Sequence, residues 1–163
     1  MDEILNASFD FTRAHPDHVA AFRGTPQRVL FRPGDKLYRF TSLPAAGFPG
    51  NELFNSPWWL PRETFEALTR MAYRSGAPLV DTARARLAVT RQWNPTLEWL
   101  AIIELTQSVY GWVGLTRQQP ETHGHRSVLL MGNLEQAYVP GLGDGAGGQG
   151  SRYALLSYYG SVT

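Results

Sequence analysis

The sequence predicts an α+β fold in a single domain that spans residues 1–163. Three observations support this prediction. The chain has 163 residues and 43% hydrophobic content, which suits one domain with a core of ordinary size. Phe65, Leu68, Met71 and Ala72 recur at the spacing of one helix face. Strand-like apolar segments then dominate from residue 87 onward, and helices followed by a run of strands are typical of an α+β fold.

The first half of the chain combines short strands, a long loop and helices. The expected elements are a helix over 17–22, strands over 28–31 and 36–41, a loop over 42–57, a helix that begins at Pro61 and a short helix over 83–87. Asp17 is expected near the N-cap of the first helix, and Asp81 and Thr82 are expected to cap the last. Arg39 stands between aromatic neighbours in the second strand. The loop is rich in Pro and Gly and long enough for a functional role.

The second half of the chain predicts a series of strands. They are expected over 99–105, 108–114, 127–131 and 153–159, with a polar loop over 116–126 and a flexible Gly-rich connection over 141–150. We find no internal repeat in the sequence. The strand run therefore belongs to the same domain as the helices that precede it.

Residues 132–140 predict a turn, a short strand and a strand-ending Pro140. A Gly-Asn pair opens the segment, and both residue types tolerate positive φ. In an extended chain Gln136 and Tyr138 share one face, whereas Glu135 lies on the other. A regular strand can therefore direct only one of Glu135 and Gln136 into a given cleft, unless a bulge intervenes.

Composition and missing motifs exclude several classes of protein. A net charge of +1 does not suggest a protein that coats DNA, and the absence of Cys excludes thiol catalysis and disulfides. No signal peptide or 18-residue apolar segment is present, so no membrane association is expected. His123 and His125 lie near Glu121 without a further ligand in view, so no metal is expected. The phosphate-binding loop, dinucleotide-binding and hydrolase-elbow motifs are all absent.

The order of several short segments resembles the ADP-ribosyltransferase fold. The segments are Leu37-Tyr38-Arg39-Phe40, Asn55-Ser56-Pro57-Trp58-Trp59, Leu87-Ala88-Val89-Thr90-Arg91-Gln92-Trp93-Asn94, the strand over 99–105, Val109-Tyr110-Gly111-Trp112-Val113-Gly114 and Leu134-Glu135-Gln136-Ala137-Tyr138-Val139-Pro140. This order is similar to that of bacterial polymorphic-toxin domains, including those at the C-termini of Rhs-type secreted effectors. The resemblance covers roughly residues 28–142. It implies two packed, mostly antiparallel sheets that form a central cleft with flanking helices.

The resemblance also implies NAD as a co-substrate and assigns roles to residues. Arg39, flanked by Tyr38 and Phe40, would hold NAD from the first strand. Ser56 would line the nicotinamide pocket, and Trp58 would form a wall of it. We expect Arg39 to be an exposed, cleft-facing side chain, so that its removal would weaken NAD binding with little loss of stability.

The late strand departs from the family's pattern. In the family the catalytic Glu stands four residues before the strand-ending Pro, and that position here is Gln136, with Glu135 beside it. Charge favours Glu135, because a carboxylate stabilises the positive charge that develops on the ribose when the bond to nicotinamide breaks. Spacing to Pro140 favours Gln136. We expect Glu135 to be the catalytic group, with Gln136 as a ribose or acceptor contact if a bulge lets both reach.

The resemblance implies a toxin that transfers ADP-ribose from NAD to a protein or RNA target in a recipient cell. Such a toxin would be a secreted effector domain delivered into the target-cell cytoplasm, monomeric and restrained by a cognate immunity protein. Three alternatives remain open. They are an NAD glycohydrolase with water as the acceptor, a nuclease toxin, and a non-catalytic interaction domain.

Overall fold

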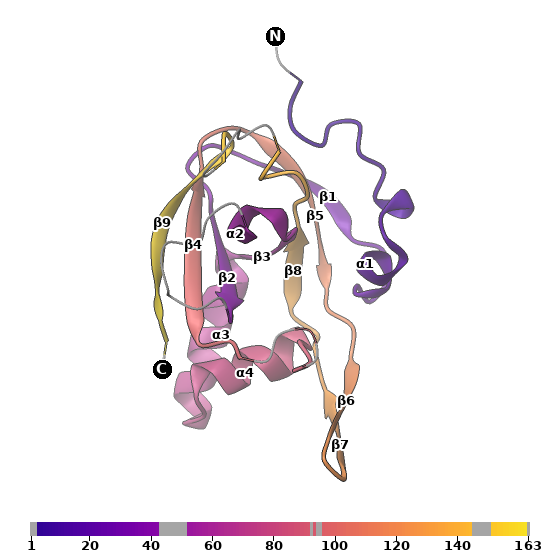
Figure 1. Cartoon of the computed structure of the whole chain (residues 1–163), viewed down its shortest axis with the longest axis vertical. Helices are drawn as coiled ribbons and strands as arrows, with labels where there is room; N and C mark the ends of the chain where they lie inside the picture. Colours follow the sequence, from indigo (N-terminus) through magenta and orange to yellow (C-terminus); the bar gives the residue numbers. More distant parts are fainter. Residues whose placement is uncertain (1–2, 43–51, 92, 94–95, 145–150, 163) are drawn as a thin grey trace.

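The computed structural model describes residues 3–42, 52–91, 93, 96–144 and 151–162. Within these residues the chain forms an α+β fold around one curled antiparallel sheet of seven strands (Figure 1). The strand order is β1-β5-β8-β3-β2-β4-β9, and β6 and β7 form a separate hairpin. The α+β class predicted from the sequence is therefore confirmed.

All the described helices lie in the first part of the chain, and six strands follow the last of them. The strands are β1 (Gln27–Phe31), β2 (Lys36–Thr41), β3 (Trp58–Pro61), β4 (Trp99–Leu105), β5 (Val109–Leu115), β6 (Gln119–His123), β7 (Arg126–Leu130), β8 (Glu135–Tyr138) and β9 (Ala154–Ser161). The helices are the 3-10 turn η1 (Phe11–Arg13), α1 (Pro16–Ala20), α2 (Glu52–Asn55), α3 (Arg62–Ser75) and α4 (Leu79–Leu87). None of the described helices combines the length and the apolar character needed to cross a membrane.

The expectation of two packed sheets is wrong in its connectivity, because β3 joins both halves into one sheet. Trp58 and Trp59 pair with β8, whereas Leu60 and Pro61 pair with β2. A strand of four residues thus changes partner halfway along its length, and the sheet bends there. Figure 1 shows β2, β4 and β9 on one side of α2 and β8, β5 and β1 on the other.

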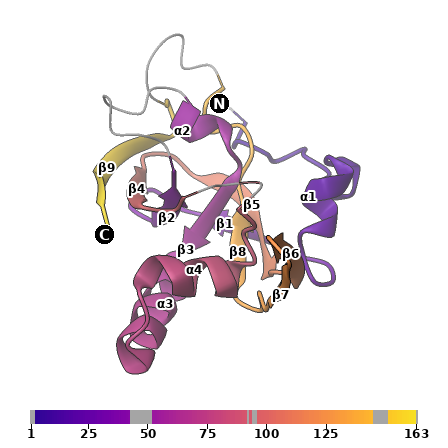
Figure 2. The ribbon, with the colours of Figure 1, turned by 60° about the horizontal axis from the view of Figure 1, so that its bottom comes forward.

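Two apolar clusters fill the fold on either side of β2. One packs between the two halves of the sheet and includes Leu37, Trp59 and Ile103, which are almost fully buried. The other, which includes Tyr38 and Leu68, packs beneath α3 and α4. Figure 2 shows these two helices together at one end of the molecule. Because β2 is covered on both faces, its side chains sit in fixed surroundings.

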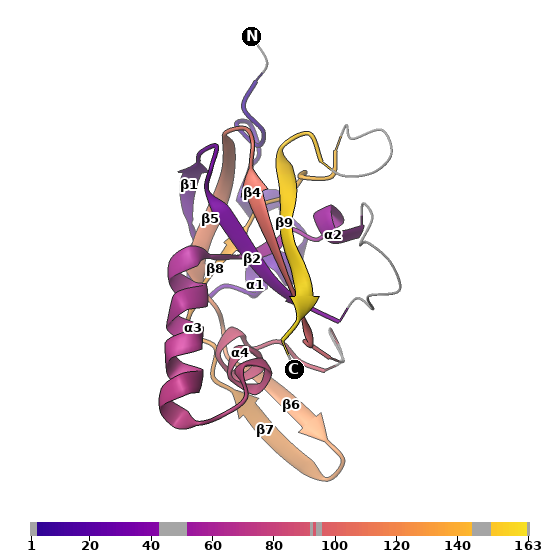
Figure 3. The same ribbon diagram turned by 90° about the vertical axis from the view of Figure 1, so that its left-hand side faces the viewer.

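The predicted polar loop over 116–126 is instead the hairpin of β6 and β7. His123 pairs with Arg126 across a two-residue turn in which Gly124 has a φ of 63°. Glycine reaches this conformation without steric cost, and two-residue turns of this kind close hairpins. The sequence did not indicate β6, because most of the hairpin is exposed and the side chains of β6 are therefore largely polar. Figure 3 shows it extending past α4, away from the main sheet.

The other predicted elements hold, with shifted ends. The helix expected at Pro61 is α3, in which Pro61 is the N-cap. Asp17 lies in the first turn of α1, two residues after the N-cap His15, whose side chain accepts a hydrogen bond from the Asp17 backbone N–H. The cap expected of Asp81 and Thr82 is wrong, because Pro78 is the N-cap of α4. Residues 43–51 of the predicted loop and residues 145–150 of the Gly-rich connection lie outside the described residues. The described end of that loop contains α2.

Candidate functional site

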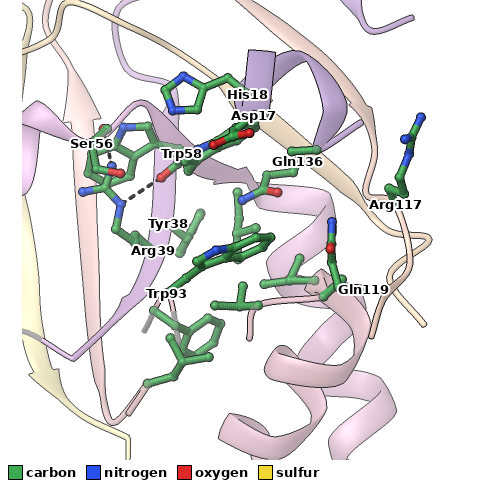
Figure 4. A pocket seen from close by; sticks show the side chains of 18 residues that line it. Asp17, His18, Tyr38, Arg39, Ser56, Trp58, Trp93, Arg117, Gln119 and Gln136 are labelled. Carbon is green, nitrogen blue, oxygen red and sulfur yellow. Dashed lines mark hydrogen bonds between the residues drawn. The ribbon is translucent and has the colours of Figure 1, made fainter. Parts of the chain in front are cut away.

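A cavity of about 400 Å³ lies where β2, β3 and β8 meet (Figure 4). Its floor consists of the lining residues on or next to these strands, namely Tyr38, Arg39, Phe40, Ser56, Trp58, Trp59, Leu60 and Gln136. Its rim consists of Asp17, His18 and Ala21 from the α1 region, Leu87, Ala88, Val89, Trp93 and Leu97 after α4, and Arg117 and Gln119 at the start of the hairpin. Several aromatic walls and a few polar groups are the usual features of a small-molecule site.

Arg39 holds the loop before β3 to the floor. Its Nε donates a hydrogen bond to the Trp58 carbonyl at 2.8 Å, and its Nη2 donates to the Ser56 carbonyl at 2.6 Å. Its Nη1 donates to the Leu53 carbonyl, and its guanidinium lies 3.6 Å above the Trp59 ring centre. The expectation of an exposed Arg39 is therefore wrong, because this side chain ties three backbone carbonyls together.

The Arg39 guanidinium carries a positive charge, and no carboxylate among the described side chains forms a salt bridge with it. Burial lowers the pKa of Arg39 to about 9, so the group is still charged at neutral pH. A guanidinium has five N–H groups, and the bonds that Arg39 forms with described residues use three of them. A desolvated cation in a cavity favours an anionic or oxygen-rich ligand.

The other sequence-predicted pocket residues all line the same cavity. Ser56 lines the cavity from the loop whose Ser56 carbonyl Arg39 binds, and Trp58 forms part of the cavity wall. Tyr38 and Phe40 also line the cavity, but both belong to the buried cluster around Phe65. Tyr38 stacks on Phe65 with 4.4 Å between ring centres, so it is a core residue as well as a lining residue.

Strand β8 separates Glu135 from Gln136. Gln136 lines the cavity, whereas Glu135 is exposed and is not among its lining residues. Gln136 pairs with Gly114 and Glu135 with Leu115 in an unbroken register, so no bulge brings the two side chains to one face. The backbone carbonyl of Glu135 accepts a hydrogen bond from Thr64 Oγ1 at 2.8 Å, which fixes this part of β8 against α3. The structure therefore brings Arg39, Ser56, Trp58 and Gln136 together and leaves the Glu135 side chain outside.

Sequence reasoning missed the polar side chains of the rim. Asp17 and His18 reach the cavity from α1, and Arg117 and Gln119 reach it from the hairpin. The expected helix over 17–22 was correct in kind, but nothing in its pattern indicated that it borders a cavity. The rim residue Trp93 is 63% exposed, and an exposed Trp is a signal for a contact surface.

The segment with Trp93 is anchored to the hairpin through a buried carboxylate. Glu121 is 7% exposed and accepts hydrogen bonds from the Arg91 backbone N–H at 2.5 Å and from Arg91 Nη1 at 2.7 Å. Glu121, noted in the sequence for its nearness to two histidines, therefore has a structural partner. Among the described residues no group of three or more His, Asp or Glu side chains is arranged to hold a metal ion.

Comparison with known proteins shows a likeness of fold. No protein-family model matches the sequence, and no curated protein matches it either. The chain superposes on Rhs1-CT, solved in complex with its cognate immunity protein RhsI1, with a TM-score of 0.52 and 11% identity, covering 86% of this chain and 83% of that one. A superposition on Tne2, solved in complex with Tni2, gives a TM-score of 0.46 and 13% identity over 86% and 95% of the two chains. The TM-score with Rhs1-CT indicates a similar fold, whereas the TM-score with Tne2 is below the level that indicates one.

Proposed function

We propose that this chain is a toxin domain that binds NAD in the cavity and breaks the bond between nicotinamide and ribose. Support for the toxin role comes from the similarity in fold to Rhs1-CT, a protein solved with a cognate immunity protein. Support for the NAD site comes from the residues that the family resemblance assigns to NAD. Arg39, Ser56, Trp58 and Gln136 all line one cavity.

The cavity offers each part of NAD a suitable contact. The guanidinium of Arg39 suits an oxygen-rich pyrophosphate or ribose, because a guanidinium binds such groups through paired hydrogen bonds. Trp58 and Trp93 offer aromatic faces to a flat ring (Figure 4). The volume of about 400 Å³ falls within the usual range for small-molecule sites. Nicotinamide leaves as a neutral molecule, so the departing group requires no acid.

The acceptor of ADP-ribose is either a macromolecule or water, and the position of Gln136 favours water. Transfer to a protein or RNA was the expectation that the family resemblance implied. A carboxamide in the cavity can both accept a hydrogen bond from a water molecule and donate one to the ribose. A Gln in this role orients a nucleophilic water without carrying charge, as in some nucleotide hydrolases. NAD glycohydrolase activity is therefore the better supported form of the proposal, with ADP-ribosyl transfer as the second form.

One experiment separates the two forms and tests the proposal as a whole. The purified domain is incubated with NAD labelled in the adenylate part, with and without bacterial lysate, and nicotinamide, free ADP-ribose and labelled macromolecules are measured. Equal amounts of nicotinamide and free ADP-ribose without lysate indicate hydrolysis. Label that appears in protein or RNA, and is removed by protease or RNase, indicates transfer. Absence of nicotinamide release under both conditions would contradict the proposal and leave the nuclease and non-catalytic readings.

A toxin of this kind requires an inhibitor in the cell that makes it. We expect expression of the domain in bacteria to stop growth, and Gln136→Ala to relieve the effect. Co-expression of a cognate immunity protein, most simply one that covers the cavity, should restore growth. Normal growth with folded wild-type domain and no partner would count against the toxin role.

A further inference from the structure

His18 is the one imidazole on the cavity rim among the residues that the structure describes, and it contacts β8 through Tyr138, two residues after Gln136. It comes from α1, and its ring lines both the main cavity and a shallower hollow outside it. His18 Nδ1 lies 3.1 Å from the Tyr138 hydroxyl, and the ring packs edge-on against Trp58 with 5.6 Å between ring centres. Figure 4 shows the His18 ring beside Trp58 at the edge of the cavity.

The geometry of β8 places the His18 ring near the reacting end of the site. Gln136 and Tyr138 are alternate residues of one strand, so they point to the same face and their Cα atoms are about 7 Å apart. The His18 ring, which lies 3.1 Å from the Tyr138 hydroxyl through Nδ1, and the Gln136 carboxamide line the same cavity. His18 Nε2 has no hydrogen-bond partner among the described residues, which leaves that nitrogen for a ligand or a water molecule.

We infer that His18 is the general base that takes the proton from the nucleophilic water, with the Tyr138 hydroxyl holding its imidazole in place. This inference rests on the proposed cleavage of NAD. The water oxygen bonds to C1′ of the ribose while the bond from C1′ to the nicotinamide nitrogen breaks, and that electron pair leaves with nicotinamide. The water proton passes to His18 Nε2 and then to solvent, so one proton is released for each NAD consumed. Nδ1–H donates to the Tyr138 oxygen throughout, which keeps the lone pair on Nε2.

The surroundings keep His18 in its basic form. The titratable and charged groups around it are His15 and Asp17 on its own helix, Tyr138 on β8, and Asp10 and Arg13 near η1. Burial, followed by repulsion from His15, lowers the pKa of His18 below its ordinary value, and the attraction of Asp17 opposes this. Burial also raises the pKa of Tyr138, so the phenol stays protonated. The lowered pKa favours the neutral imidazole, which is the form that can accept a proton.

The test compares the pH dependence of nicotinamide release by the wild type, His18→Asn and Tyr138→Phe. His18→Asn should lower kcat by about 10²-fold or more, the usual contribution of a general base, and abolish the fall of kcat on the acidic side. Added imidazole should restore part of the activity of His18→Ala. His15→Asn is the matched control, because Asn keeps the cap of α1 and His15 does not line the main cavity. It should keep the wild-type kcat.

Tyr138→Phe tests the direction of the hydrogen bond. If His18 Nδ1–H donates to the Tyr138 hydroxyl, the bond favours the imidazolium. Its loss then lowers the pKa of His18, so the fall of kcat on the acidic side of the pH profile (the acidic limb) moves to lower pH. A limb that moves to higher pH would overturn the assignment, because Tyr138 would then be the donor and Nε2 would carry the proton. A His18→Asn variant with kcat within twofold of the wild type and an unchanged acidic limb would overturn the role of His18 alone. A wild type that releases no nicotinamide would instead contradict the proposed function.

Discussion

The floor of the cavity comes from three strands in the middle of the sheet, whereas its rim comes from segments at the periphery. On the floor, Arg39 is fixed by three carbonyls and an aromatic ring, and Gln136 stands on a strand paired on both sides. On the rim, His18 has one hydrogen bond and Trp93 is largely exposed. The floor can therefore hold a ligand in a fixed position, and the rim can adjust around it. Substitutions on the floor should change stability or chemistry strongly, whereas a substitution of His18 on the rim should change stability weakly and act on the chemical step instead.

The largest expected effect follows from Arg39→Ala. Three backbone carbonyls would lose their donor and the loop before β3 would lose its anchor, which should cost about 3 kcal/mol or more in the free energy of unfolding. Activity should fall below detection. Chemical denaturation measures the first effect, and nicotinamide release measures the second. Arg62→Ala is the control, because Arg62 forms an exposed i,i+4 pair with Glu66 whose loss should change stability little. Equal stability of the two variants would mean that Arg39 does not anchor the loop.

Arg39 also illustrates what the sequence could predict of the site. The family resemblance assigned Arg39 to a cleft, and Arg39 lines the floor of the cavity. The sequence could not reveal the hydrogen-bond partners of Arg39, because all three are backbone carbonyls, and every residue has a backbone carbonyl whatever its side chain. Distance along the chain was a further obstacle for the rim. His18 and Tyr138 are separated by 120 positions, and only the pairing of β8 with β3 and β5 brings Tyr138 to α1.

The second prediction separates two neighbours on one strand. Gln136→Ala should lower kcat for NAD cleavage by about 10²-fold, comparable with the loss of a preorganised hydrogen-bond donor. Glu135→Gln should change kcat less than twofold, because the Glu135 side chain is exposed outside the cavity. Both variants should unfold near the wild-type midpoint. The reverse result would restore Glu135 as the catalytic group and would require β8 to shift its register when NAD binds.

The third prediction concerns the anchor between the two parts of the rim. Glu121→Gln replaces a buried carboxylate that accepts two hydrogen bonds from Arg91, at a cost of about 2 kcal/mol in the free energy of unfolding. The segment with Trp93 should then hold NAD less well, so KM should rise about fivefold while kcat stays near the wild-type value. Glu66→Gln, on the exposed face of α3, is the control and should change neither constant. A fall in kcat without a change in KM would mean that this anchor serves the chemical step.

The smallest expected effect is the dependence of stability on pH through His18. Burial lowers the pKa of His18 in the folded chain below its ordinary value of 6.5, so the unfolded chain takes up this proton at a higher pH than the folded chain does. Between the two pKa values the unfolded state binds more protons, and stability falls as the pH drops through that window below 6.5. The fall stops once the folded chain is protonated as well. Relative to the wild type, His18→Asn should therefore gain stability between pH 7.5 and 5.5, by a small amount because the ring is only half-buried. Urea denaturation at both pH values measures this difference, and a relative stability that does not change with pH would mean that the folded chain leaves the pKa of His18 at its ordinary value.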